Sequence, residues 1–137
     1  MGQSKSFEGL EDSRVLNLFE MEALVRSKKE RKNSDVFIVD VRDKFEVEEY
    51  GTIPFSLHIP LSEIRRAFRM SESEFRGRYN SRMPRKSDKL VFYDQRNGRA
   101  ATAVEVVNTF GFVKATYFSG GFSEWIKKRE QAVDEDL

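Results

Sequence analysis

The sequence predicts an α/β fold built on a mostly parallel sheet. Residues 36–41 (VFIVDV) and 89–93 (KLVFY) are apolar and β-branched with almost no alternation, which is typical of strands buried on both faces. Stretches with apolar residues at helical spacing lie between the strand-like segments. Strands that alternate with helices along the chain favour parallel pairing, because each connection must cross back over the sheet.

Each further element rests on its own pattern. Residues 99–110 form a clear helical pattern, because Ala100, Ala103 and Val107 fall on one face and Gly111 supplies the stop. The other expected elements are helices at 20–31, 44–50, 62–68 and 122–129, a short helix anchored by Phe75 and Tyr79, and short strands at 57–59 and 115–118.

Length and composition indicate one domain with a substantial core. The chain has 137 residues, of which 39% are hydrophobic and 12% aromatic, too many for a disordered chain. We place the domain at 13–130, between a flexible segment at 1–12 and an acidic tail at 131–137. The net charge is only +1, so we expect no nucleic-acid partner. No apolar run is long enough to span a bilayer.

The N-terminus contains a candidate lipidation site. Gly2 follows the initiator methionine, and Ser6 completes the N-myristoylation pattern in MGQSKS. The other interpretation is a disordered start that fits a loose pattern by chance. Because no apolar signal segment follows Met1, we expect a cytoplasmic protein. A single acyl chain would attach it to a membrane only weakly and peripherally.

The loop after the second long strand is the expected ligand site, because ligands of open parallel sheets bind beyond the carboxyl ends of strands. Its residues are Asp94, Gln95, Arg96, Asn97, Gly98 and Arg99. Backbone N–H groups at the start of the next helix, together with the two arginines, describe a cup for an anion. The alternative is an ordinary strand-to-helix turn with solvated arginines.

From residue 36 onward the chain resembles a rhodanese homology domain, the fold of thiosulfate sulfurtransferases. Three pieces carry the resemblance in the family's order: VFIVDVRDKFEVEEYGTIPFSLHIPL at 36–61, LVFYDQRNGRAATAV at 90–104 and GFVKATYFSGGFSEW at 111–125. The resemblance implies a central, mostly parallel five-stranded sheet flanked by helices on both faces. It also implies that Asp40 and Arg42 form a structural brace for the loop.

Sulfur-transferring members of this family carry cysteine at the first loop position and arginine at the last. These positions fall on Asp94 and Arg99 here, and Asn97 stands where the family usually has glycine. The chain contains no cysteine. Because a carboxylate cannot form or pass on a persulfide, we expect no sulfurtransferase activity, and we expect no cofactor and no metal.

Three interpretations of Asp94 remain open. We favour a catalytically inactive module in which the Asp94 carboxylate fills the cup, accepts loop N–H bonds, pairs with Arg99 or Arg96, and repels oxyanions. The first alternative is a family sulfurtransferase whose native cysteine has been replaced. The second is an Asp-dependent hydrolase or phosphoryl-transfer enzyme, which needs a metal and partner carboxylates near the site.

Charge is distributed unevenly along the chain. Segment 62–89 has nine basic and four acidic residues, whereas segment 35–50 has six acidic and two basic ones. This polarity favours a protein partner, although a solvated face is the ordinary interpretation. The basic segment could also meet an anionic membrane and support attachment through Gly2. We expect the lone His58 to pack rather than bind a metal, and Phe122 and Trp125 to lie in the core.

Overall fold

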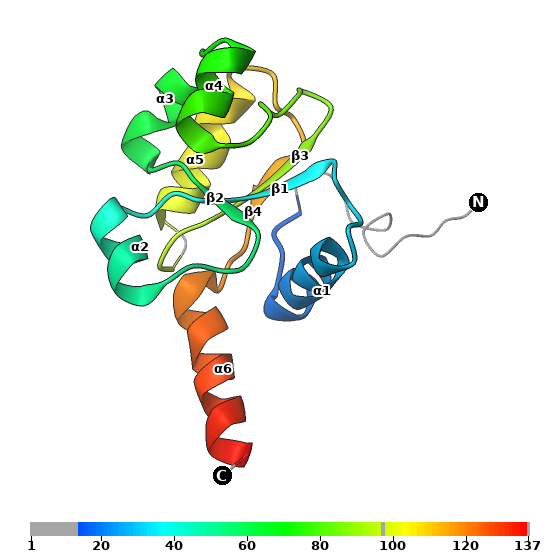
Figure 1. Cartoon of the computed structure of the whole chain (residues 1–137), viewed down its shortest axis with the longest axis vertical. Coiled ribbons are helices and arrows are strands. Elements are labelled where there is room, and N and C mark those ends of the chain that lie inside the picture. The colour runs from blue at the N-terminus through cyan, green and yellow to red at the C-terminus, as the bar shows by residue number, and fades with distance from the viewer. Residues whose placement is uncertain (1–13, 97, 137) are drawn as a thin grey trace, which may run out of the picture.

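A computed structural model of the chain describes residues 14–96 and 98–136 (Figure 1). Gly2 and the segment predicted to be flexible, 1–12, lie outside the described residues, as does Asn97. The sheet is all parallel, with strand order β2-β1-β3-β4. Its strands are β1 (Val36–Asp40), β2 (Ser56–His58), β3 (Lys89–Tyr93) and β4 (Ala115–Tyr117).

The described sheet has four strands, so the expectation of five is wrong. A fifth position exists only as one parallel bridge between Leu16 and Phe118, beside β4. The chain cannot continue as a strand past Leu16, because Asn17 caps the first helix. Its side chain accepts the Glu20 N–H, and the Glu20 carboxylate accepts the Asn17 N–H, which forms a capping box.

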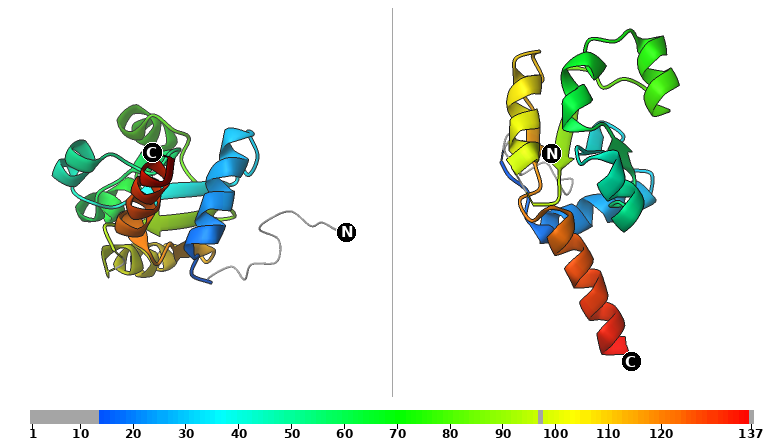
Figure 2. Two further views of the ribbon diagram at one scale, coloured as in Figure 1. Left: turned by 90° about the horizontal axis from the view of Figure 1, so that it is seen from below. Right: turned by 90° about the vertical axis from the view of Figure 1, so that its left-hand side faces the viewer.

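Six α-helices lie in the described part of the chain. They are α1 (Leu18–Lys29), α2 (Lys44–Tyr50), α3 (Ile64–Ala67), α4 (Glu72–Tyr79), α5 (Gly98–Asn108) and α6 (Gly121–Asp136). The helix expected at 62–68 is divided into the 3-10 turn η1 (Leu61–Glu63) and α3. Helix α6 runs past the expected end at residue 129 and projects from the body of the molecule (Figures 1 and 2).

Side chains along the central strands alternate between two cores. In β1, Phe37 and Val39 pack in a core with residues of α3, α4 and α5, whereas Val36 and Ile38 pack in a second core with residues of α1 and α6. Helices therefore cover both faces of the sheet (Figure 2). Phe122 and Trp125 lie in the second core, as predicted.

The sheet brings the carboxyl ends of β1 and β3 to one edge, because the strands are parallel and paired in register from Val36 with Lys89 to Asp40 with Tyr93. The start of α2 follows β1, and the start of α5 follows β3. The candidate site lies where these segments meet. No helix in the described chain is long and apolar enough to cross a membrane.

Candidate functional site

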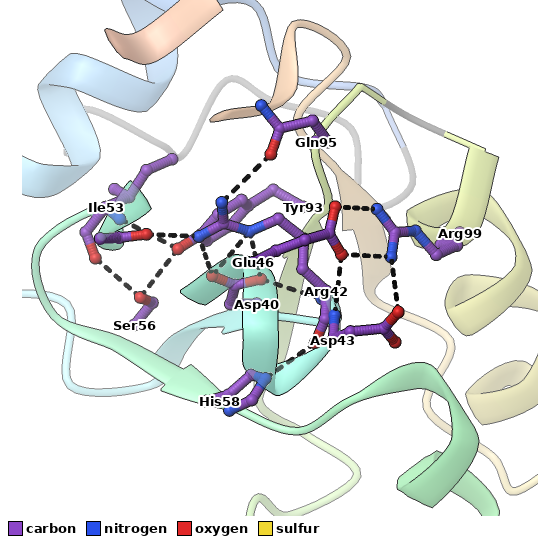
Figure 3. A network of polar contacts seen from close by, with 11 residues as sticks. Asp40, Arg42, Asp43, Glu46, Ile53, Ser56, His58, Tyr93, Gln95 and Arg99 are labelled. Atoms are coloured by element: carbon purple, nitrogen blue, oxygen red, sulfur yellow. Dashed lines mark hydrogen bonds and ion pairs between the residues drawn. The ribbon is translucent and has the colours of Figure 1, made fainter. Parts of the chain in front are cut away.

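The centre of the site is a fully buried ion pair at the carboxyl end of β1, where Asp40 ends the strand and Arg42 follows it. Arg42 Nη2 lies 2.7 Å from Asp40 Oδ2, and Arg42 Nε lies 3.0 Å from Oδ1 (Figure 3). The guanidinium also donates to the carbonyl of Gly51 at 2.6 Å and to Gln95 Oε1 at 3.2 Å. Because a buried charge is costly unless it is paired and hydrogen bonded, these contacts hold three separate segments in one arrangement.

Aromatic rings complete the surroundings of Arg42. Its guanidinium lies 4.3 Å from the centre of the Phe122 ring and 5.7 Å from that of Tyr93. The Tyr93 hydroxyl accepts the Ile53 N–H at 3.0 Å and contacts the Ser56 hydroxyl. Burial, and then the negative charge of Asp40, raise the pKa of Tyr93 above its ordinary value, so the phenol stays neutral.

His58 lies at the end of β2, partly buried, with Nε2 2.8 Å from the Arg42 carbonyl oxygen. It contacts the backbone of the site. In the described chain, no three His, Asp or Glu side chains gather closely enough to hold a metal ion.

Asp94 follows β3 and is buried, with 2% of its surface exposed. Its Oδ2 atom accepts the Ala100 N–H at 3.0 Å, in the first turn of α5. Its Oδ1 atom is also buried and has no hydrogen-bond partner among the described residues. The carboxylate thus lies at the N-terminus of an 11-residue helix, a position that favours negative charge.

Arg99 turns mainly toward helix α2. Its Nη1 and Nη2 atoms donate to the two carboxylate oxygens of Glu46 at 2.6 and 2.9 Å, and Asp43 lies 3.9 Å away (Figure 3). The distance from Arg99 Nε to Asp94 Oδ2 is 4.0 Å, the limit of an ion pair. The hydrogen bond from Arg99 lowers the pKa of Glu46.

Glu46 is a site residue that sequence reasoning missed. A local signal was available, because Asp43 and Glu46 have the spacing of a capping box. The Glu46 carboxylate accepts the Asp43 N–H at 3.0 Å, which fixes it at the start of α2. Since α2 begins directly after β1, that carboxylate stands at the sheet edge where Arg99 arrives.

The start of α6 fixes the loop backbone from the other side. The Phe122 N–H donates to the Asp94 carbonyl at 2.9 Å, and the Ser123 N–H donates to the Gln95 carbonyl at 3.1 Å. Gly121 makes this contact possible. It has a φ of +64°, and a Cβ atom there would lie 2.3 Å from the Arg96 carbonyl oxygen.

The loop therefore gathers only part of the expected set. Asp94, Gln95 and Arg99 join the network around Arg42 and Glu46, whereas Arg96 and Gly98 are exposed. Within the described chain, no hydrogen bond or ion pair joins Arg96 to Asp94, one of the two pairings that we expected.

Comparison with known proteins supports the resemblance. The sequence model described as "Rhodanese-like domain" matches residues 22–128. The chain belongs to this family. It is 36% identical over 107 residues to thiosulfate sulfurtransferase/rhodanese-like domain-containing protein 3 of Mus musculus, a match that covers 78% of this chain and 64% of that protein. The chain thus spans slightly less than two thirds of this relative.

Other relatives of this rhodanese-like domain are matched over most of their length. Human thiosulfate:glutathione sulfurtransferase is 32% identical over 115 residues, with 83% of this chain and 94% of that protein covered. The structure of the human single-domain sulfurtransferase TSTD1 superposes with a TM-score of 0.74 at 30% identity, covering 83% of this chain and 96% of that one. Unlike a persulfide-forming enzyme, this chain has no cysteine.

Proposed function

We propose that this rhodanese-like domain is a catalytically inactive protein-interaction or regulatory module whose cup is filled by its own Asp94. The buried Asp94 carboxylate at the N-terminus of α5 is the observation that carries the proposal. By the family resemblance, this is the position of the reactive cysteine. Persulfide transfer needs a thiolate that both accepts and releases sulfur, and a carboxylate can do neither.

The charges around the cup support weak affinity for oxyanions. Asp94 places a negative charge inside it, and the positive charge of Arg99 is already compensated by Glu46 and Asp43. An incoming thiosulfate or phosphate would therefore meet a carboxylate and no free guanidinium from Arg99.

The Asp-dependent phosphoryl-transfer alternative has less support from the geometry. Asp94 is only 2% exposed, which keeps its oxygens from an in-line attack. Asp40 is engaged on both oxygens by Arg42 and cannot serve as a free partner carboxylate.

We propose a cytoplasmic role through a protein partner, with peripheral membrane attachment if Gly2 is acylated.

A sulfur-transfer assay from thiosulfate to cyanide tests this proposal. We expect no thiocyanate from the unmodified chain and none from a matched Asp94→Ser variant. We expect turnover from Asp94→Cys, which would show that the cup is intact and that Asp94 prevents sulfur transfer. If Asp94→Cys also produces no thiocyanate, Arg96 and the glycine at position 98 instead of 97 have changed the geometry of the loop, and the domain is a scaffold. Turnover by the unmodified chain would contradict the proposal.

A binding experiment provides a second test without turnover. We expect inorganic phosphate and thiosulfate to bind the unmodified chain weakly in a calorimetric titration, because of the charge at Asp94. Asp94→Ala should increase that affinity by removing the charge. Tight phosphate binding by the unmodified chain would show that the cup is open.

A further inference from the structure

A groove of about 670 Å³ lies beside helices α3 and α4. These helices stand at the opposite end of the molecule from α6 (Figure 1). Four of the groove's lining residues are arginines, with one acidic residue among them: it is lined by Ser62, Arg65, Arg66, Arg69, Met70, Glu74 and Arg78. The groove lies outside the cup, and none of its lining residues belongs to the site described above.

Three of the arginines are available to a ligand. Arg65, Arg66 and Arg69 are exposed, and none of them forms a hydrogen bond or ion pair through its side chain with any residue that the structure describes. The guanidinium of Arg69 lies 5.3 Å from the centre of the Phe110 ring, which positions the group without occupying its N–H donors.

The acidic groups nearby are already engaged. The Glu74 carboxylate accepts the Ser71 N–H at 2.9 Å and belongs to the capping box of α4. The Glu63 carboxylate binds Arg78 at 3.1 Å and the Tyr79 hydroxyl at 2.8 Å. The local carboxylates therefore hold the walls of the groove together, and within the described part of the chain they leave the other three arginines without a direct ion-pair partner.

We propose that this groove binds an extended acidic segment of a partner protein, whose carboxylates or phosphates pair with Arg65, Arg66 and Arg69. The guanidinium group binds planar oxyanions through two parallel hydrogen bonds, and a row of such groups in a concave surface fits successive acidic residues. This inference rests on the proposed interaction role and gives it a location and a partner chemistry. It does not use the chemistry of the cup.

The exposed residues favour a protein segment over a lipid surface. A membrane-binding surface combines basic residues with large apolar side chains that enter the bilayer. The exposed large hydrophobic residues of the described chain all lie outside 61–79: they are Phe19, Phe45, Tyr50, Phe55, Val113 and Val133. Among the described residues, the groove thus offers charge and concavity but no large apolar side chain exposed enough to enter a bilayer.

Fluorescence anisotropy with a labelled peptide of alternating glutamate and serine tests the proposal, together with its phosphoserine form. We expect saturable binding that weakens as salt is added. Arg65→Glu combined with Arg66→Glu should lower the affinity by at least about tenfold, because two attractive contacts become repulsive. The matched control is Arg26→Glu combined with Lys29→Glu on α1, which makes the same change of charge and should alter the affinity by less than about twofold.

A milder variant separates the effect of guanidinium geometry from that of charge. It also avoids the risk that the charge-reversed variant does not fold. Arg65→Lys combined with Arg66→Lys keeps both charges but removes the planar fork, so its affinity should fall between those of the parent and the glutamate variant. Equal losses in the groove variant and the α1 control would overturn the proposal. So would binding to phosphatidylserine-containing vesicles through Arg65 and Arg66 without binding to the peptides. The peptide result does not depend on sulfur transfer, so failure here is distinct from failure of the proposed inactivity.

Discussion

The buried pair of Asp40 and Arg42 permits a quantitative prediction about the stability of the site. We consider Asp40→Asn, which keeps the shape of the side chain and removes its charge. The Asp40 carboxylate accepts from Nε and Nη2 of Arg42 and from the Arg42 backbone N–H. In the variant, one oxygen remains as an acceptor, but an amide NH₂ group replaces the other oxygen and cannot accept from the guanidinium.

The expected cost follows from the burial of the pair. Both side chains are 0% exposed, so water cannot replace the lost partner of Arg42. Removing one member of a buried pair typically costs about 3–5 kcal/mol of unfolding free energy. The guanidinium keeps its bonds to the Gly51 carbonyl and to Gln95 Oε1, which places the expected loss near the lower end, about 3 kcal/mol. That is a large part of the roughly 5–15 kcal/mol of a typical domain.

Urea denaturation followed by circular dichroism measures this loss. The matched control is Asp43→Asn, the same substitution at a side chain that is 78% exposed and 3.9 Å from Arg99. We expect that control to change the unfolding free energy by less than about 1 kcal/mol. A loss below about 1 kcal/mol in Asp40→Asn would refute the reasoning, because it would mean that Arg42 does not depend on the pair.

Three further predictions concern Glu46 and Gly121, which frame the cup, and Gly77 in helix α4, which lies outside it. The folded pKa of Glu46 is lowered by Arg99, so the bond stabilises the protein above the ordinary glutamate pKa of 4.5 and is lost as pH falls through the lowered value. Glu46→Gln should therefore cost about 1 kcal/mol near neutral pH and progressively less in acid, and urea titrations over pH would contradict this if the difference persisted. Gly121→Ala should cost more than about 1 kcal/mol, because its φ is +64° and its Cβ would meet the loop backbone. Gly77→Ala in helix α4, where a Cβ meets nothing within 4 Å, should instead raise the unfolding free energy by about 0.5–1 kcal/mol in the same thermal or urea measurement.

The elements with strong local patterns could be predicted from the sequence. Strand β3 has the expected bounds, and β1 ends one residue early, because continuous apolar residues buried on both faces leave little doubt about a strand. The fifth strand came from the family resemblance alone. It is absent from the described sheet because the Asn17 capping box begins a helix directly after Leu16, a local competition that the resemblance did not take into account.

The site was predictable in its backbone and less so in its side chains. The position of Asp94 at the start of α5 follows from the strand-to-helix order. The partner of Arg99 does not, because Glu46 lies 53 positions away in the sequence, whereas the expected partner, Asp94, lies in the same loop. The contact of Gly121 with the loop likewise joins segments that only the fold brings together.

Two separate features of the cup explain the expected lack of sulfur transfer, and a substitution at residue 94 changes only one of them. One is the nucleophile, since Asp94 cannot carry sulfur. The other is the free guanidinium, since Glu46 holds both terminal nitrogens of Arg99. Asp94→Cys reverses only the first loss. That variant loses the bond from the Ala100 N–H to Asp94 Oδ2. The backbone bonds from α6 to the loop do not involve the residue 94 side chain, so the loop backbone should keep its geometry. If Asp94→Cys transfers sulfur only at a high thiosulfate concentration, the contact between Glu46 and Arg99 is the second cause of the domain's inactivity.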